Sequence, residues 1–309
     1  MMLRFEAKQK AFKIHNTWIG GEMGERPTVL VGSIFQKKHF IVKDASKGTF
    51  DAKKARELLQ VEEECSLMTG NPRMIDIVAE TIEAMTRYIS FIVEHCDVPF
   101  FVDSPLARVR LAAMRFCAEN KIMDRAIYNT IEPHGTPEEL DQLKDLKVKS
   151  AVLMGCSSQH VKPKDRLTLI GGSSSEKGLI GLALDSGVEN ILVDAGVLDL
   201  PSSSWTAQAI MDIKNETGYP AGCAPSNALY TWLRNKKLGS PEMEACGGGV
   251  LSLPVFAGSD FIFYGPIQHA RWVFPAIALV DAMLAYGAKL NRVKPASREH
   301  PLYKFISKS

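Results

Sequence analysis

The chain has 309 residues, 46% of them hydrophobic, and a formal net charge of +2. This length suffices for one large domain, and the near-balanced charge gives no basis for a nucleic-acid groove or an anionic membrane surface. The longest apolar stretch, Trp272 to Leu284, is shorter than the roughly 20 residues that a spanning helix needs, so we expect no integral membrane segment.

The six cysteines form no CxxC pair and none has a metal-type spacing with a histidine. We therefore expect no metal site, and free thiols of this kind are typical of a reducing compartment. The first residues, Met1 to Glu6, contain no apolar signal core. Together these features predict a cytoplasmic protein.

The chain begins with two short runs of alternating character within residues 5–18, followed by a glycine-rich turn at Gly20, Gly21 and Gly24. Alternating runs separated by turn residues are typical of a β-hairpin. The sequence therefore predicts an N-terminal extension, residues 1–27, whose hairpin lies across one end of the main domain.

Eight strand–helix units follow. Each unit pairs a short run of β-branched or aromatic residues with an amphipathic helix that begins near a capping residue such as Asp51, Thr81 or Thr136. The predicted strands span residues 28–33, 74–78, 99–103, 126–131, 151–154, 191–194, 220–223 and 261–264, and the helices 51–68, 81–95, 106–120, 137–147, 174–186, 203–217, 226–235 and 271–285, with an extra helix or loop at 241–256.

This alternation predicts parallel strands joined by crossover helices. Eight units in about 250 residues fit a closed barrel better than an open sheet. We therefore expect an α/β protein with a single (β/α)8 TIM barrel at residues 28–290 and a C-terminal tail at 291–309. Nothing in the composition suggests a linker between two domains.

Polar residues recur where the predicted strands end. In residues 191–197, Asp194 closes a buried strand and Gly196 permits a sharp turn. Because the carboxyl ends of barrel strands meet at one mouth, such residues converge there. The full set at these ends is Asp76 with Glu80, Asp103, Asn129, Asp194, and Ser226 with Asn227.

A ring of carboxylates and amides without Lys or Arg suits a neutral ligand that carries several N–H donors. Each carboxylate also has a simpler explanation, because Asp often caps a helix or forms a turn. The recurrence at several strand ends favours a binding site. His160 and His269 lie near mouth loops, where either could act as a general acid or simply face solvent.

Lys162, Lys164 and Arg166 form a basic loop after the fifth strand. This loop either meets an acidic tail or partner or is an ordinary solvated loop. The glycine pairs and triplets of the chain match no phosphate-binding motif and indicate turns.

Several blocks of the chain resemble the pterin-binding barrels, which include dihydropteroate synthases and methyltetrahydrofolate:corrinoid methyltransferases. The blocks are Phe101-Val-Asp103-Ser104, Ala126-Ile-Tyr-Asn129, Ile191-Leu-Val-Asp194-Ala-Gly196 and Gly222-Cys-Ala-Pro-Ser226-Asn227. Further blocks, Val31-Gly-Ser-Ile-Phe35, Thr69-Gly-Asn-Pro72 and Asp76-Ile-Val-Ala-Glu80-Thr81, are similar to one branch. That branch holds the H subunit of tetrahydromethanopterin S-methyltransferase and the bacterial methylcorrinoid protein:tetrahydrofolate methyltransferases of glycine betaine metabolism.

The resemblance implies that Asp103, Asn129 and Asp194 bind the amino-pyrimidine edge of a pterin, with Ser226 beside them. Asn227 matches the residue that lies near N5 of the pterin and is the catalytic candidate. Asp76 and Glu80 would support the site or handle a proton. Dihydropteroate synthases carry a Lys after the seventh strand where this chain has Pro-Ser-Asn, which argues against synthase chemistry.

The implied function is methyl transfer from methylcobalamin, carried by a partner corrinoid protein, to N5 of tetrahydrofolate. One alternative is the H subunit of a membrane-associated tetrahydromethanopterin methyltransferase complex. A second, from another class, is a non-catalytic scaffold that docks a corrinoid protein. The family also implies a homodimer formed through barrel helices.

Overall fold

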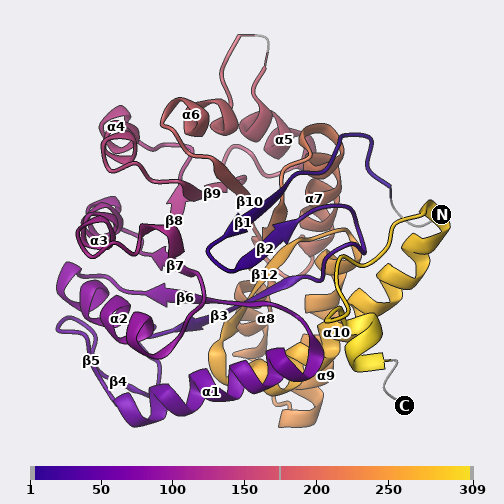
Figure 1. Cartoon of the computed structure of the whole chain (residues 1–309), viewed down its shortest axis with the longest axis horizontal. Coiled ribbons are helices and arrows are strands. Elements are labelled where there is room, and N and C mark those ends of the chain that lie inside the picture. Colours follow the sequence, from indigo (N-terminus) through magenta and orange to yellow (C-terminus); the bar gives the residue numbers. More distant parts are fainter. Residues whose placement is uncertain (1–3, 174, 307–309) are drawn as a thin grey trace.

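The computed structural model describes residues 4–173 and 175–306. Within these residues eight parallel strands close into a barrel in the order β10-β11-β12-β3-β6-β7-β8-β9, and helices surround it (Figure 1). The predicted (β/α)8 fold is confirmed. The barrel strands are β3 (Val29–Ile34), β6 (Arg73–Val78), β7 (Phe100–Asp103), β8 (Ala126–Ile131), β9 (Ser150–Met154), β10 (Asn190–Asp194), β11 (Ala221–Cys223) and β12 (Phe261–Pro266).

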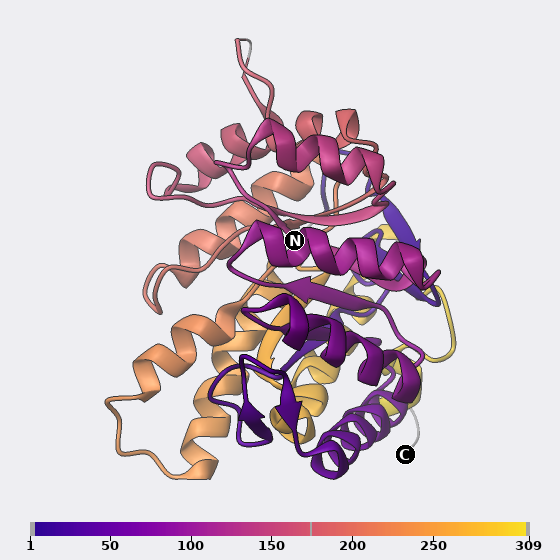
Figure 2. The ribbon, with the colours of Figure 1, turned by 90° about the vertical axis from the view of Figure 1, so that its left-hand side faces the viewer.

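Three of the described helices begin at a capping side chain. Asp51, Thr81 and Thr136 each accept a backbone N–H bond from the first turn of their helix, as expected of N-caps. The helices are α1 (Ala52–Thr69), α2 (Ile82–His95), α3 (Ala107–Glu119), α4 (Pro137–Asp145), α5 (Pro163–Gly171), α6 (Leu179–Asp185), α7 (Ser203–Thr217), α8 (Pro225–Leu233), α9 (Ser240–Phe256) and α10 (Ala270–Ala288). Figure 2 shows α8 and α9 projecting from the barrel as a helical hairpin.

The structure differs from the sequence prediction in two segments. The helix expected at 174–186 is shorter and corresponds to α6, and an unpredicted helix, α5, precedes it, beginning at Pro163 and ending before Gly172, which has φ +91°. The short strands β4 (Val42–Asp44) and β5 (Thr49–Phe50) form an unpredicted hairpin after β3. The expected helix start at Ser174, the first three residues of the extension and the last three of the tail lie outside the described residues.

The predicted N-terminal hairpin is present and closes the amino-terminal end of the barrel. β1 (Ala11–Ile14) pairs with β2 (Thr17–Gly20), and Ile14 and Ile19 join the apolar cluster inside the barrel. The His15 ring at the hairpin turn lies 2.9 Å from carboxylate oxygens of Asp97 and Asp124, which precede β7 and β8. The hairpin is therefore a plug for this end.

Strand alternation divides the interior into layers. The inward residues nearer the plug are apolar, and the next inward position along several strands is polar. Ile75 and Ile77 of β6 face the surrounding helices, so Met74 and Asp76 face inward. The apolar layer consists of Val29, Val31, Met74, Phe101, Ile127, Val152, Leu192, Phe261 and Phe263. This layer forms a floor below the carboxyl-terminal mouth.

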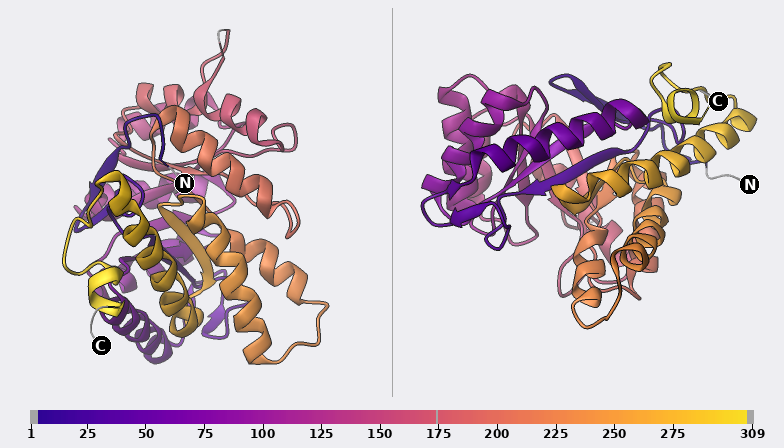
Figure 3. Two further views of the ribbon diagram at one scale, coloured as in Figure 1. Left: turned by 90° about the vertical axis from the view of Figure 1, so that its right-hand side faces the viewer. Right: turned by 90° about the horizontal axis from the view of Figure 1, so that it is seen from below.

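The closing helix α10 is unusually apolar. Of the described helices, one segment, Ile267–Asn291, is long and apolar enough to cross a membrane by length and composition, and 56% of its most apolar window is buried. It packs beside α1 and against the short π-helix Leu302–Ile306 (Figure 3). Such burial is typical of a core helix, so the expected absence of an integral membrane segment stays a prediction.

Candidate functional site

A cavity of about 220 Å³ opens at the carboxyl ends of the barrel strands, and all eight strands or the turns after them contribute to it. This is the end at which barrel enzymes build their sites. The lining residues are Ser33, Gln36, Asp76, Val78, Asp103, Asn129, Thr130, Met154, Asp194, Ala224, Ser226, Asn227, Phe263 and Gly265.

The cavity gathers most of the residues predicted from the strand ends. Asp103 is in register with Asn129 on the next strand, and Asp194 is in register with Met154. Because inward positions recur every second residue, these side chains lie directly above the apolar floor. Six of the seven predicted site residues therefore meet in one place, and Glu80 is the exception.

Asp194 is held by the turn that follows its strand. Its side chain is 7% exposed and accepts a 2.7 Å hydrogen bond from the backbone N–H of Gly196. Gly196 has φ +75°, and a Cβ there would collide with Cys156, so the turn requires glycine. Burial raises the pKa of Asp194 to about 6, although the Gly196 N–H and the Arg166 charge oppose this shift.

Arg166 corrects the expectation of a solvated basic loop. It is fully buried and donates to the carbonyl oxygens of Ala195 and Gly196, both at 2.9 Å, and to Thr206 Oγ1 at 3.1 Å. Arg166 thus braces the turn behind Asp194, while Lys162 and Lys164 are exposed. The sequence could not reveal this role because its partners lie about 30 or more residues away.

Asp103 ends β7 beside a buried arginine. Burial raises the pKa of Asp103 to about 6; Arg110 opposes the shift, whereas Asp194 and Glu132 add to it. Arg110 donates to the Ser104 carbonyl oxygen at 2.6 Å and to Glu139 Oε1 at 3.1 Å. Its guanidinium is therefore bound behind the strand end, and none of the described residues lining the cavity is Lys or Arg.

Asp76 lies in the same cavity, next to Asp103 in the barrel order. Its Oδ2 atom accepts a 2.7 Å hydrogen bond from the Ser33 hydroxyl. Burial, reinforced by the charge of Asp103, raises the pKa of Asp76 well above its ordinary value. The structure does not bring Glu80 into the site, because the chain leaves the barrel after Val78 and Glu80 is an exposed partner of Lys37 at 3.2 Å.

The residues after β11 occupy another part of the wall. Ser226 is 2% exposed, and its hydroxyl donates to the Phe263 carbonyl oxygen at 2.9 Å. The hydroxyl can therefore act toward a ligand only as an acceptor. Asn227 stands in the first turn of α8 with an exposed side chain. Its amide is thus available at the mouth, where it can both donate and accept.

Sequence reasoning missed several lining residues. Ser33 follows the same inward alternation as Val29 and Val31, so the period of β3 could have identified it. Thr130 is different, because a bulge in β8 between Tyr128 and Ile131 brings both Asn129 and Thr130 to the cavity. Strand propensity does not predict a bulge.

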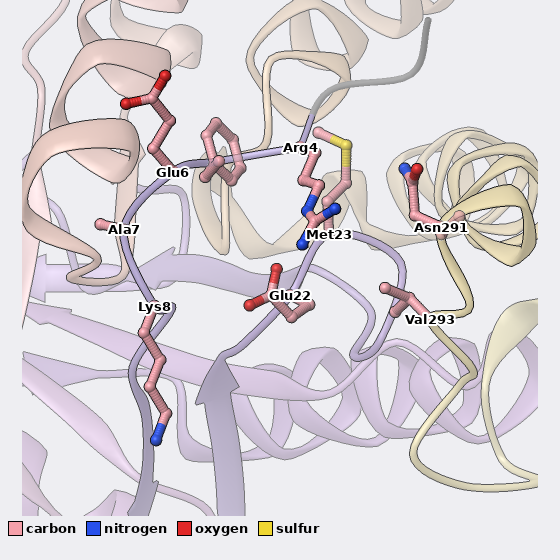
Figure 4. A pocket seen from close by; sticks show the side chains of 10 residues that line it. Arg4, Glu6, Ala7, Lys8, Glu22, Met23, Asn291 and Val293 are labelled. Atoms are coloured by element: carbon pink, nitrogen blue, oxygen red, sulfur yellow. The ribbon is translucent and has the colours of Figure 1, made fainter.

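A second hollow, of about 280 Å³, lies at the opposite end (Figure 4). Arg4, Lys8, Glu22 and Met23 line it together with the end of α10, and its charged side chains are exposed or half-buried. Residues 4–173 and 175–306 contain no cluster of His, Cys, Asp or Glu able to hold a metal ion. The buried carboxylates at the mouth are therefore the stronger candidate for chemistry.

The cavity can bind a planar ring through its N–H groups. Three inward carboxylates supply acceptors, the asparagine amides adapt to either role, and Met154 and Phe263 supply apolar contacts. Hydrogen bonds to ionised acceptors contribute about 1.5–3 kcal/mol each. These groups suit the site to holding and orienting a ligand.

Comparison with solved structures supports the architecture. A dihydropteroate synthase of Yersinia pestis aligns with TM-score 0.60 and 13% identity, covering 89% of this chain and 98% of that one. A dihydropteroate synthase of Xanthomonas albilineans aligns with TM-score 0.57 and 15% identity, covering 90% and 99%. At this identity the likeness concerns the fold alone.

Comparison with related sequences identifies the family as well as the fold. The H subunit of tetrahydromethanopterin S-methyltransferase from Methanothermobacter marburgensis is 35% identical over 311 residues, covering 99% of this chain and 100% of the relative. The corresponding protein of Methanosarcina barkeri is 37% identical over 314 residues, covering 98% and 99%. The family model for the tetrahydromethanopterin S-methyltransferase MtrH subunit matches residues 7–296. The chain therefore belongs to the MtrH family and is a methyltransferase of that type.

Proposed function

We propose that this protein moves a methyl group between a corrinoid-bearing partner protein and N5 of a reduced pterin, with tetrahydromethanopterin as the preferred pterin. The names of relatives that match almost the full chain support this pterin over tetrahydrofolate, the substrate expected from the sequence blocks. Tetrahydrofolate is the second candidate, because the resemblance to the bacterial methylcorrinoid:tetrahydrofolate enzymes covers the same blocks.

The observation that carries the proposal is the ring of inward carboxylates at the mouth. Asp103, Asn129 and Asp194 line one cavity and are buried or half-buried. The amino-pyrimidine edge of a pterin offers adjacent N–H donors that match such acceptors. A ligand with these donors restores the hydrogen bonds that burial would otherwise deny the carboxylates.

The chemical contribution of the chain is orientation. In one direction N5 attacks the methyl carbon in line, the carbon–cobalt electron pair stays with the corrinoid, and N5 loses its proton. Holding the reacting atoms in line removes much of the entropic barrier. Asn227 lines the cavity at the mouth, and we assign it the contact with N5, because its amide can follow the change in N5 protonation.

Exposed apolar side chains support a protein donor over a free small molecule. They come from segments that follow five of the barrel strands. These residues are Phe40, Ile82, Leu106, Leu198, Trp205 and Leu238. Exposed apolar groups of this kind are typical of protein interaction surfaces. A homodimer and a cytoplasmic location stay predictions.

A methyl-transfer assay tests the function. The protein is mixed with methylcobalamin and either tetrahydromethanopterin or tetrahydrofolate, and the cobalamin absorbance is followed while pterin binding is measured by calorimetry. We expect demethylation with tetrahydromethanopterin, more slowly with tetrahydrofolate, and none with the Asp103→Ala variant. Absence of both turnover and pterin binding would instead favour the non-catalytic docking scaffold.

A further inference from the structure

Asp76 is buried in the cavity with half of its carboxyl group unmatched. It is 3% exposed, and its Oδ2 atom accepts the Ser33 hydroxyl. Among the described residues no group donates a hydrogen bond to its Oδ1 atom. Leaving a buried acceptor unmatched costs about 1–3 kcal/mol, so such an atom calls for an explanation.

Two buried acids at the plugged end have partners for both carboxyl oxygens. Both carboxyl oxygens of Asp281 accept bonds from Thr28, and Oδ2 also accepts one from Asn71. Asp260 accepts two bonds from Lys214 and one from the backbone N–H of Ala221. Asp76 differs from them because its spare oxygen belongs to a residue that lines the cavity, where a ligand can supply the missing partner.

The surroundings of Asp76 favour its protonated form. The carboxyl of Asp103 faces Asp76 from β7. The neutral side chains of Ser33, on β3, and Gln36, just after β3, line the same cavity. The Lys37–Glu80 ion pair lies outside, at the surface. Burial and Asp103 raise the pKa of Asp76, whereas the Ser33 hydrogen bond lowers it. Ser33 thus adjusts the ease with which Asp76 gives up its proton.

The barrel order places Asp76 toward the reacting edge of the ligand. Asp103, Asn129 and Asp194 stand on β7, β8 and β10, so a ring held by them directs its opposite edge toward β12 and β3. Asp76 on β6 flanks that opposite side from one direction, and Asn227 after β11 flanks it from the other. N5 lies on the pyrazine half of a pterin, away from the amino-pyrimidine edge.

We propose that Asp76, positioned by Ser33, is the group that exchanges the proton at N5 during methyl transfer. This inference rests on the proposed function. When the methyl leaves N5, the N5–carbon electron pair stays on nitrogen, the carbon bonds to the cobalt of the reduced corrinoid, and Asp76 gives its proton to N5, directly or through one water. In the reverse direction the Asp76 carboxylate takes the proton that N5 loses.

The Asp76→Asn variant keeps the shape of the side chain and removes the transferable proton. We expect its pterin dissociation constant to stay within about threefold of wild type and its methyl-transfer rate to fall by about 100-fold or more. The matched control is Glu80→Gln, four residues along and outside the cavity, which should retain the wild-type rate. Thermal melting shows whether each variant is folded.

Ser33→Ala supplies a readout that a structural role would not produce. It removes the hydroxyl that stabilises the Asp76 carboxylate, so the midpoint of the pH–rate profile should move upward by about one pH unit. This variant decides the question if Asp76→Asn does not fold.

Two outcomes would overturn the proton role while leaving the proposed function intact. One is an active wild type whose Asp76→Asn variant transfers methyl at the same rate with the same pH profile. The other is loss of pterin affinity large enough to account for all the lost activity, which would make Asp76 a binding group only. A wild type that transfers no methyl to any reduced pterin would refute the proposed function itself.

Discussion

The two ends of the barrel bury carboxylates in different ways. At the plugged end, Asp281 and Asp260 are matched by Thr28, Asn71 and Lys214. At the mouth, Asp76, Asp103 and Asp194 line a cavity whose described lining contains no cation. Burial raises the pKa at both ends, to about 7 for Asp281 and about 6 for Asp103 and Asp194.

The difference therefore lies in what completes the hydrogen bonding. The plugged end completes it from within the chain and so contributes to stability. The mouth leaves acceptors for a ligand, at a cost to the stability of the unliganded protein. This division between a stabilising end and a functional end is common to barrel enzymes. Substitutions at the plugged end should therefore lower mainly stability, whereas substitutions at the mouth should lower mainly ligand affinity.

The largest expected effect is at the plugged end. Lys214 is 1% exposed and donates two hydrogen bonds to Asp260, at 2.7 and 2.6 Å. Lys214→Ala leaves the enclosed Asp260 charge without its cation, which should lower the free energy of unfolding by about 3 kcal/mol or more in urea titrations. The double variant with Asp260→Asn should recover part of that loss. A loss below about 1 kcal/mol would contradict this view of the plugged end.

The next effect concerns binding at the mouth. Asp194→Ala removes the acceptor that faces the ligand, so the pterin dissociation constant should rise by about 100-fold, the equivalent of two charge-assisted hydrogen bonds. Stability should change little by comparison, since the main bond lost within the chain is that from the Gly196 N–H. Calorimetric titration of the two proteins measures the change. Unchanged affinity would remove Asp194 from the site.

The smallest effect is the pH dependence of the unliganded protein. Asp103 has a folded-state pKa of about 6, above the usual value of 3.8, so its contribution to stability is full below about pH 4 and is lost as pH rises through 6. The Asp103→Asn variant removes this loss. Its gain in free energy of unfolding over the wild type should therefore be about 1–2 kcal/mol larger at pH 8 than at pH 4. Urea unfolding at both pH values tests this. An equal effect at both would show that Asp103 titrates normally.

Much of this contrast can be predicted from the sequence, because strand period and strand ends are local features. Asp103, Asn129 and Asp194 each follow an apolar run, and they meet as barrel geometry requires. Ser33 obeys the same period but carries no charge, so the pattern of strand-end carboxylates does not include it.

The rest depends on tertiary contacts. The braces at Arg166 and Lys214 pair with residues 29–46 positions away, which no local pattern reveals. Glu80 follows Asp76 closely in sequence, yet it points to solvent because the strand has already ended at Val78. The unpredicted helix α5 lies between Pro163 and Gly172, in a stretch whose polar composition is typical of a loop.

The most direct measurement is a structure of the protein bound to a reduced pterin, tetrahydromethanopterin first. We expect the ring at the barrel mouth, its amino-pyrimidine edge against Asp103, Asn129 and Asp194, and N5 toward Asn227 and Asp76. A ring bound at the plugged end, or one at the mouth with its amino-pyrimidine edge turned away from these three residues, would contradict the central claim.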